Sequence, residues 1–214
     1  MKVIRHTLVS EGSTDANLIP IIDWTLKHAA GVPLSEGVRA DFWRLPKRPQ
    51  NTTDRLLKAV EIFPCEVLFV HRDADGELPQ ARCDEICRAF DKAGIKLPAV
   101  AVVPVRMLEA WLCFNEDAIR RASGNPNGKA PLNLPTLKRV ESRPDPKKDL
   151  REALLTASEL SGRRRKKFDA TAAFWRVVDF IDDFSPLREL PSFQAFENSI
   201  KLLKDNGWKA GFYF

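Results

Sequence analysis

Short apolar runs alternate, along the first half of the chain, with longer stretches in which apolar residues recur every three or four positions. Three runs rich in β-branched residues predict strands: 3–9, 67–70 and 98–105. Helical spacing between these runs predicts helices: about 14–28, 53–62 and 79–93. Alternation of this kind is typical of an α/β fold in which helices flank a mostly parallel sheet.

Capping residues refine the ends of these elements. Ser13 or Thr14 is placed to cap the first helix, and Thr53 or Asp54 the second. Gly94 is placed to end the third helix. A weaker alternation over Glu36–Leu45 indicates one further short strand.

The pattern changes after Asn115. Residues 124–135 are rich in Gly, Pro and Asn, which predicts a loop. Apolar spacing beyond this loop predicts helices: about 148–158, 170–180 and a last one that begins near 193. We therefore predict an α/β domain over 1–123 and a helical extension over 124–214 that packs on it, or one continuous domain. The aromatic tail, Trp208–Phe214, would cap the core or contact a partner.

Composition and charge narrow the class of protein. The chain has 214 residues, of which 44% are hydrophobic and 29% charged, as in ordinary globular domains. No apolar run reaches the roughly 20 residues that span a bilayer, and no signal peptide is recognisable, so we expect no membrane partner and a cytoplasmic location. A net charge of +5 permits binding to nucleic acid. The four cysteines lack zinc-site spacing, which favours reduced, buried or half-buried thiols.

Acidic residues follow the predicted strands. Glu11 and Asp15 come after the first strand, Asp73 and Asp75 after the second, and Glu109 shortly after the third. Sites in α/β sheets lie at the carboxyl ends of the strands. Oxygen ligands are the ones that Mg²⁺ prefers. The pattern therefore predicts a site for a divalent cation.

Each motif also has a purely structural interpretation. The segment E-G-S-T-D could cap a helix, and D-A-D-G could form a turn. Glu109 could pair with Arg106 on one helix face, where Trp111 is better explained as core. A D-x-D segment also occurs in haloacid-dehalogenase phosphatases, but there it follows the first strand, which disfavours that class.

Basic residues gather in two places. Lys147 and Lys148 form one pair, and a longer run follows Gly162: Arg163, Arg164, Arg165, Lys166 and Lys167. The run suits contact with a phosphate backbone, which would be salt-sensitive. A solvated surface segment is the alternative.

The ordered set of motifs resembles a known family. E-G-x-T-D at 11–15, followed by D-x-D-G at 73–76, is similar to the signature of TOPRIM domains, the fold of topoisomerases, bacterial primases and nucleases of the overcoming-lysogenization-defect (OLD) type. Three further motifs resemble a smaller bacterial family of OLD-related proteins of unknown function, some of which occur near phage-defence genes: V-P-V-R-x-L-E-A-W-L at 103–112, D-P-K-K at 145–148 and L-P-S-F-Q-x-F-E at 190–197. The resemblance covers nearly the whole chain.

This resemblance implies a Rossmann-like sheet and two-cation phosphodiester chemistry with Mg²⁺ or Mn²⁺. It implies that Glu11, Asp73 and Asp75 hold the first ion, and that Asp15 and Glu109 help to hold the second. Lys147 or Lys148 would offset charge on the phosphate. The chain lacks the G-x-x-x-x-G-K-[ST] motif of the ATPase that OLD nucleases carry, so a separate ATPase is an implied partner. Its only tyrosine is Tyr213, which makes topoisomerase chemistry an unsuitable interpretation.

Two functions follow as hypotheses. The first is a metal-dependent nuclease that acts on DNA, with a role in phage defence and with these residues on the nucleic acid: Arg72, Arg106 and Arg163–Lys167. The second is a non-catalytic nucleic-acid- or partner-binding subunit. A nuclease requires the carboxylates to converge, whereas a binding subunit tolerates one that is engaged by Arg72 or Arg106. A third hypothesis is a phosphohydrolase that acts on small phosphate esters, and it predicts a closed pocket.

Overall fold

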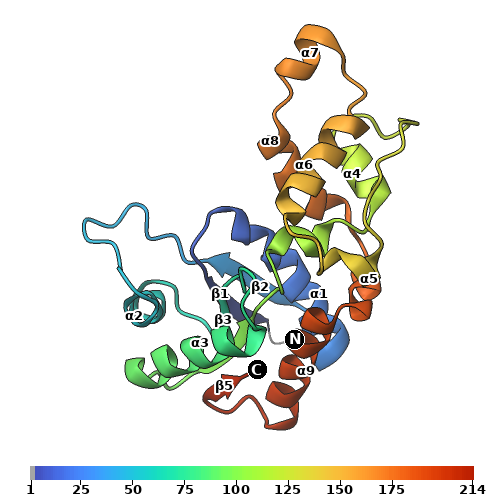
Figure 1. Cartoon of the computed structure of the whole chain (residues 1–214). Helices are drawn as coiled ribbons and strands as arrows, with labels where there is room; N and C mark the ends of the chain where they lie inside the picture. Colours follow the sequence, from blue (N-terminus) through green and yellow to red (C-terminus); the bar gives the residue numbers. More distant parts are fainter. Residues whose placement is uncertain (1–2) are drawn as a thin grey trace. The chain divides into compact units, whose positions relative to one another are not determined.

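The computed structural model describes residues 3–214, which form two compact units (Figure 1). The first unit contains the chain up to Val105 and the segment Pro191–Phe214. The second unit contains Arg106–Leu190. The chain therefore leaves the first unit once and returns to it.

A five-stranded sheet forms the centre of the first unit. Its strands are β1 (Ile4–Val9), β2 (Ser35–Arg39), β3 (Val67–His71), β4 (Pro98–Val102) and β5 (Gly211–Tyr213). Their order is β2-β1-β3-β4-β5, and every neighbouring pair is parallel. The predicted α/β fold with a parallel sheet is confirmed.

Helices cover both faces of this sheet. They are α1 (Leu18–Ala30), α2 (Thr52–Ile62), α3 (Pro79–Ala93) and α9 (Pro191–Asp205), and a 3₁₀ turn, η1 (Thr14–Asn17), precedes α1. Helices α1 and α9 pack together on one face, and α2 and α3 pack together on the other. Because both faces are covered, β3 and β4 are buried along their whole length, which explains their unbroken apolar runs.

Alternate residues of β3 serve the two faces. Leu68 and Val70 join the core cluster that contains Leu56 of α2 and Ile86 of α3. Phe69 points the other way and makes an edge-to-face contact with Phe196 of α9, with ring centroids 6.1 Å apart. This alternation holds the sheet between the two helical layers.

The second unit is helical. It consists of η2 (Leu108–Leu112), α4 (Glu116–Ala122), α5 (Leu137–Val140), α6 (Pro146–Ala157), α7 (Gly162–Lys166), α8 (Ala170–Val177), η3 (Val178–Phe180) and η4 (Ser185–Glu189). Its largest fully buried side chains are Trp111 and Phe184. Within residues 3–214, no helix combines the length and the apolar character needed to cross a bilayer.

Several predicted boundaries were wrong for local reasons. The third predicted strand ends at Val102, because Pro104 has no N–H with which to extend the ladder. The strand predicted over Glu36–Leu45 is β2, and it ends at Arg39. Beyond it the Asp41 side chain accepts a hydrogen bond from the backbone N–H of Trp43, which turns the chain away.

Gly94 ends α3 as predicted, but the caps predicted at the starts of the first two helices were wrong. Asn51 caps α2 by accepting a hydrogen bond from the Asp54 backbone N–H at 2.9 Å. Ser13 makes no side-chain capping bond. The aromatic tail adds strand β5, which the prediction missed because three residues are too few to show alternation. Its Phe212 does cover the core, with its ring centroid 5.7 Å from that of Phe90.

The cysteines are free thiols. Cys113 is buried, and the other three are half-buried, as predicted. Burial raises the pKa of Cys113 to about 12 and that of Cys83 to about 11. Thiols with such pKa values are weak nucleophiles at neutral pH.

Gly37 occupies a position on β2 where a side chain has no room. It pairs in register with His6 of β1, and a Cβ atom here would lie 2.4 Å from the His6 Cε1 and 2.6 Å from the Ile19 Cγ2. His6 cannot easily move, because its Nε2 lies 2.8 Å from the Asp23 Oδ1. Ser35 donates a further hydrogen bond to the same carboxylate oxygen.

Gly37→Ala is therefore expected to lower the free energy of unfolding by about 1–3 kcal/mol, the usual cost of overpacking. Urea unfolding followed by circular dichroism measures the change. Glu36→Ala is the matched control, because Glu36 is the exposed neighbour on the same strand and its change should stay within about 0.5 kcal/mol. A Gly37→Ala variant as stable as the wild type would contradict the proposed steric conflict.

Candidate functional site

The strand order places a natural site at the carboxyl ends of β1 and β3. The chain runs outward from β1 to β2 on one side and to β3, β4 and β5 on the other, so the order reverses between β1 and β3. Ligands of open α/β sheets bind at such a reversal. Val9 pairs in register with Val70, so the segments that follow the two strands begin side by side. Glu11 and Asp73 lie just beyond these paired residues.

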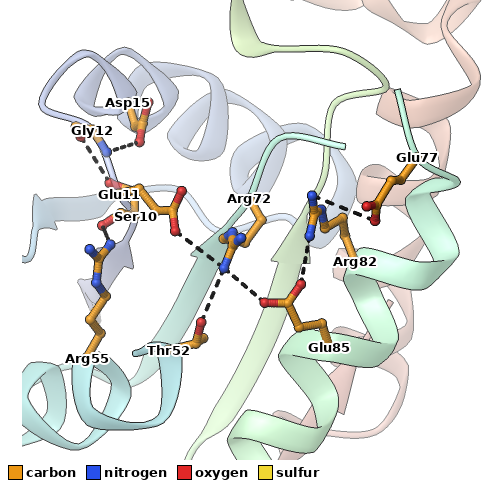
Figure 2. A network of polar contacts seen from close by, with 10 residues as sticks. All are labelled: Ser10, Glu11, Gly12, Asp15, Thr52, Arg55, Arg72, Glu77, Arg82 and Glu85. Carbon is orange, nitrogen blue, oxygen red and sulfur yellow. Dashed lines mark hydrogen bonds and ion pairs between the residues drawn. The ribbon is translucent and has the colours of Figure 1, made fainter. Parts of the chain in front are cut away.

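Three side chains from these two segments meet. His71, the last residue of β3, is buried, and its Nε2 lies 3.4 Å from the Asp73 Oδ1 and 3.9 Å from the Asp15 Oδ1. Asp15 is also buried, and its other carboxylate oxygen accepts a hydrogen bond from the Gly12 backbone N–H at 2.8 Å (Figure 2). Two carboxylates from two strand ends therefore share one histidine nitrogen.

The other nitrogen of His71 determines what this cluster can do. The His71 Nδ1 lies 2.9 Å from the carbonyl oxygen of Val102, and a carbonyl can only accept, so Nδ1 carries a proton. The Nε2 is then the ring atom that faces the carboxylates of Asp15 and Asp73. A cation held by these two carboxylates would lie beside this nitrogen.

Glu11 points away from this cluster. Its carboxylate lies 3.3 Å from the Arg72 Nη1, and the same nitrogen donates a hydrogen bond to Glu85 at 3.0 Å. Figure 2 shows Arg72 between Glu11 and Glu85, and Arg82 of α3 between Glu85 and Glu77, which lies in the turn before that helix. Glu11 is about half exposed, so this ion pair is weak enough to exchange for another partner.

Asp75 lies in a tight turn. The Glu77 backbone N–H donates to the carbonyl oxygen of Ala74, and the two residues between them have positive φ, 51° for Asp75 and 89° for Gly76. Asp-Gly is the pair that this type of turn favours. Asp75 is exposed, whereas Ala74 is fully buried and anchors the turn.

The remaining predicted residues belong to the second unit. Glu109 is buried in η2, seven residues past the end of β4, and its carboxylate lies 3.9 Å from the Nζ of the exposed Lys147. Lys148 lies at the same distance from Glu152. Arg106 precedes η2 and is half-buried.

The basic run after Gly162 is fully accessible. Arg163–Lys167 are all exposed, and most of the run forms the short helix α7. Exposed cations on a helix suit either contact with a polyanion or simple solvation.

A preformed metal centre is not present among residues 3–214: no three His, Cys, Asp or Glu side chains are arranged to hold an ion. The donors near His71 still suit a hard cation in their chemistry, because they are carboxylate oxygens with a nitrogen beside them. Asp15 and Asp73 would supply two oxygen donors to such an ion, and water would complete its coordination. Glu11 is a further candidate donor, since its ion pair with Arg72 is partly exposed.

Sequence reasoning missed two features of this region. It left the role of His71 open, and only the pairing of β1 with β3 brings Asp15 and Asp73 to that histidine. It also overlooked a pocket lined by Trp43 and three arginines, Arg39, Arg48 and Arg55. An exposed tryptophan within the basic segment D-F-W-R-L-P-K-R was the available signal.

Comparison with family models, with curated proteins and with solved structures finds no match to this chain. The resemblance to TOPRIM and OLD proteins, the two-ion chemistry and the role in phage defence therefore stay predictions.

Proposed function

We propose that the protein is a metal-dependent hydrolase of phosphodiester bonds, with DNA as the favoured substrate. The observation that supports this proposal is the meeting of Asp15 and Asp73 at the Nε2 of His71, at the reversal point of the sheet. Two carboxylates on a buried histidine, with a partly exposed glutamate and an arginine beside them, form a donor set for a hard cation and a phosphate.

Each side chain has a separate role in this proposal. Asp15 and Asp73 hold the cation. The hydrogen bond to Val102 fixes the orientation of the His71 ring, and the Nε2 of that ring positions the two carboxylates. Glu11 turns from Arg72 to the cation, and Arg72 then faces the phosphate. The bound ion would activate water and offset charge on the phosphate.

The test is the conversion of supercoiled plasmid to nicked circles by the purified protein. We expect nicking with Mg²⁺ or Mn²⁺ and none with EDTA, because the carboxylates repel a phosphate when no cation lies between them. Titration calorimetry with Mn²⁺ measures ion binding without turnover. Nicking that continues in EDTA would contradict the proposal. A failure to nick the plasmid with both Mg²⁺ and Mn²⁺ would contradict it as well.

A non-catalytic binding subunit is the second candidate, and one observation favours it. Glu11 is engaged by Arg72, which is the arrangement that a binding subunit tolerates and a nuclease must undo. Arg72→Ala separates the two functions. A nuclease should keep its Mn²⁺ affinity or gain some, because Glu11 is released, whereas a binding subunit should show no Mn²⁺ binding before or after the change.

A further inference from the structure

The segment between β2 and α2, residues 40–51, carries an unusual exposed aromatic residue, and we refer to it as the Trp43 loop. Trp43 is 71% exposed. Figure 1 shows this segment as the long loop that leads from β2 to α2 and extends beyond the edge of the sheet. Trp43 therefore presents a large flat ring to the solvent, which a ligand can cover.

Trp43 is held in place although it is exposed. The guanidinium of Arg48 lies over its ring, with 3.8 Å from the guanidinium carbon to the ring centroid. Its backbone N–H donates to the Asp41 carboxylate at 3.0 Å. This hydrogen bond, and then the neighbouring Arg39, lower the pKa of Asp41, so that carboxylate stays ionised. The loop therefore presents a preordered flat surface.

A pocket extends from this surface to the turn after β1. It has a volume of about 490 Å³ and is lined both by the Trp43 loop and by the turn after β1, which contributes Ser10, Glu11 and Ser13. Glu11 is therefore shared between the pocket and the polar network around Arg72. A ligand in the pocket would lie beside Glu11.

The charge of the pocket favours an anion. Its lining includes three arginines, Arg39, Arg48 and Arg55, against two acids, Glu11 and Asp41. Arg55 is fixed by donating to the carbonyl oxygen of Ser10 at 3.0 Å, and Arg39 lies 3.4 Å from Asp41. Guanidinium groups bind phosphate and stack on flat rings, and both properties are useful for a nucleotide.

A flat ring with adjacent arginines is the arrangement by which proteins bind unpaired bases. A paired duplex hides the faces of its bases, so Trp43 could not stack on them. A purely apolar ligand would make no use of the three guanidinium groups in the lining. The combination selects a ligand that has both an accessible base and a phosphate.

We propose that the Trp43 loop binds single-stranded nucleic acid, with an unpaired base stacked on Trp43 and the adjoining phosphate at Arg39 and Arg55. The strand then passes Glu11 and reaches the carboxyl ends of β1 and β3. This inference deepens the proposed function and rests on it for the choice of a nucleic acid as the ligand.

The experiment measures the binding of labelled 20-nucleotide strands by fluorescence anisotropy in EDTA, where no cleavage takes place. The probes are oligothymidine DNA, oligouridine RNA, a DNA duplex and an abasic strand of equal charge. We expect one or both single strands to bind more tightly than the duplex and the abasic strand. Trp43→Ala should weaken this binding at least about 5-fold, and Trp43→Phe should restore most of it.

Control substitutions distinguish base stacking on Trp43 from the loss of any exposed apolar or cationic side chain. Leu78→Ala removes another exposed apolar side chain and should leave the affinity unchanged. Arg88→Ala removes an exposed cation on α3, and it should weaken binding less than Arg48→Ala does. Equal affinity of wild type and Trp43→Ala, or equal affinity for the abasic strand, would overturn the inference. An absence of binding to every probe would overturn it as well.

The failure of this inference is distinguishable from the failure of the proposed function. If binding of single strands depends on Trp43 but no metal-dependent nicking occurs, the inference stands and the hydrolase proposal fails. If the protein nicks plasmid but Trp43→Ala binds single strands as tightly as the wild type, the hydrolase proposal stands and the inference fails.

Discussion

Asp73→Ala is expected to lower the rate of metal-dependent plasmid nicking by at least about 100-fold. Residues that merely support metal ligands cost about 10- to 100-fold when they are removed, so the loss of a direct ligand should cost no less. Asp73 approaches the His71 Nε2 more closely than Asp15 does, 3.4 Å against 3.9 Å. Initial nicking rates at saturating Mg²⁺ measure the effect.

The fold should survive this substitution. The Asp73 side chain is about one-third exposed and lies after the end of β3, so its removal should change the free energy of unfolding by about 1 kcal/mol or less. Asp73→Asn keeps the volume and removes the charge, and we expect the same loss of nicking. Asp84→Ala on α3 is the matched control, because Asp84 lies away from the site and accepts a hydrogen bond from the exposed Gln80. Full activity in Asp73→Ala would exclude the assigned site.

Trp111→Ala is expected to destabilise the protein by about 3–5 kcal/mol, the usual result for a buried tryptophan. Trp111 lies in η2 of the helical unit, and none of its surface is exposed. Truncation removes a large apolar surface from the core and leaves a cavity that the surrounding helices cannot fully close. The urea midpoint, followed by circular dichroism at 222 nm, measures the loss.

Trp43→Ala provides the matched control for this prediction, since it makes the same change at an exposed tryptophan. Its effect on the free energy of unfolding should stay within about 0.5 kcal/mol. Trp111→Phe should recover part of the stability, because a ring again fills most of the space. A Trp111→Ala midpoint equal to that of Trp43→Ala would mean that the helical unit does not depend on this side chain.

Local signals were sufficient where an element is stabilised by its own residues. Helix α3 runs from Pro79 to Ala93 and ends at Gly94, whose φ of 62° belongs to the left-handed region, and the sequence predicted these bounds. Gly and Pro act within one turn of chain, so a short window contains their whole effect. The buried run of β3 was recognisable for the same reason.

Local sequence signals failed to predict features that depend on contacts with a distant segment of the chain. Strand β5 exists because Gly211–Tyr213 pairs with β4, more than 100 positions earlier in the chain. Asn51 was overlooked as a cap because its neighbours Thr53 and Asp54 are equally good candidates by type. The pocket at Trp43 depends on the bend after β2, which a hydrogen bond to Asp41 creates.

The sequence by itself determined the α/β class, the order of the main elements and the presence of acidic residues after β1 and β3, because these properties follow from periodicity and from residue type. Only the tertiary structure decided that β1 and β3 are neighbours, that Asp15 and Asp73 share His71, and that Glu11 faces Arg72 instead. The physical reason is the same in each case. Strand order and side-chain partners depend on contacts between segments far apart along the chain, and no short stretch of sequence contains the energy of such a contact.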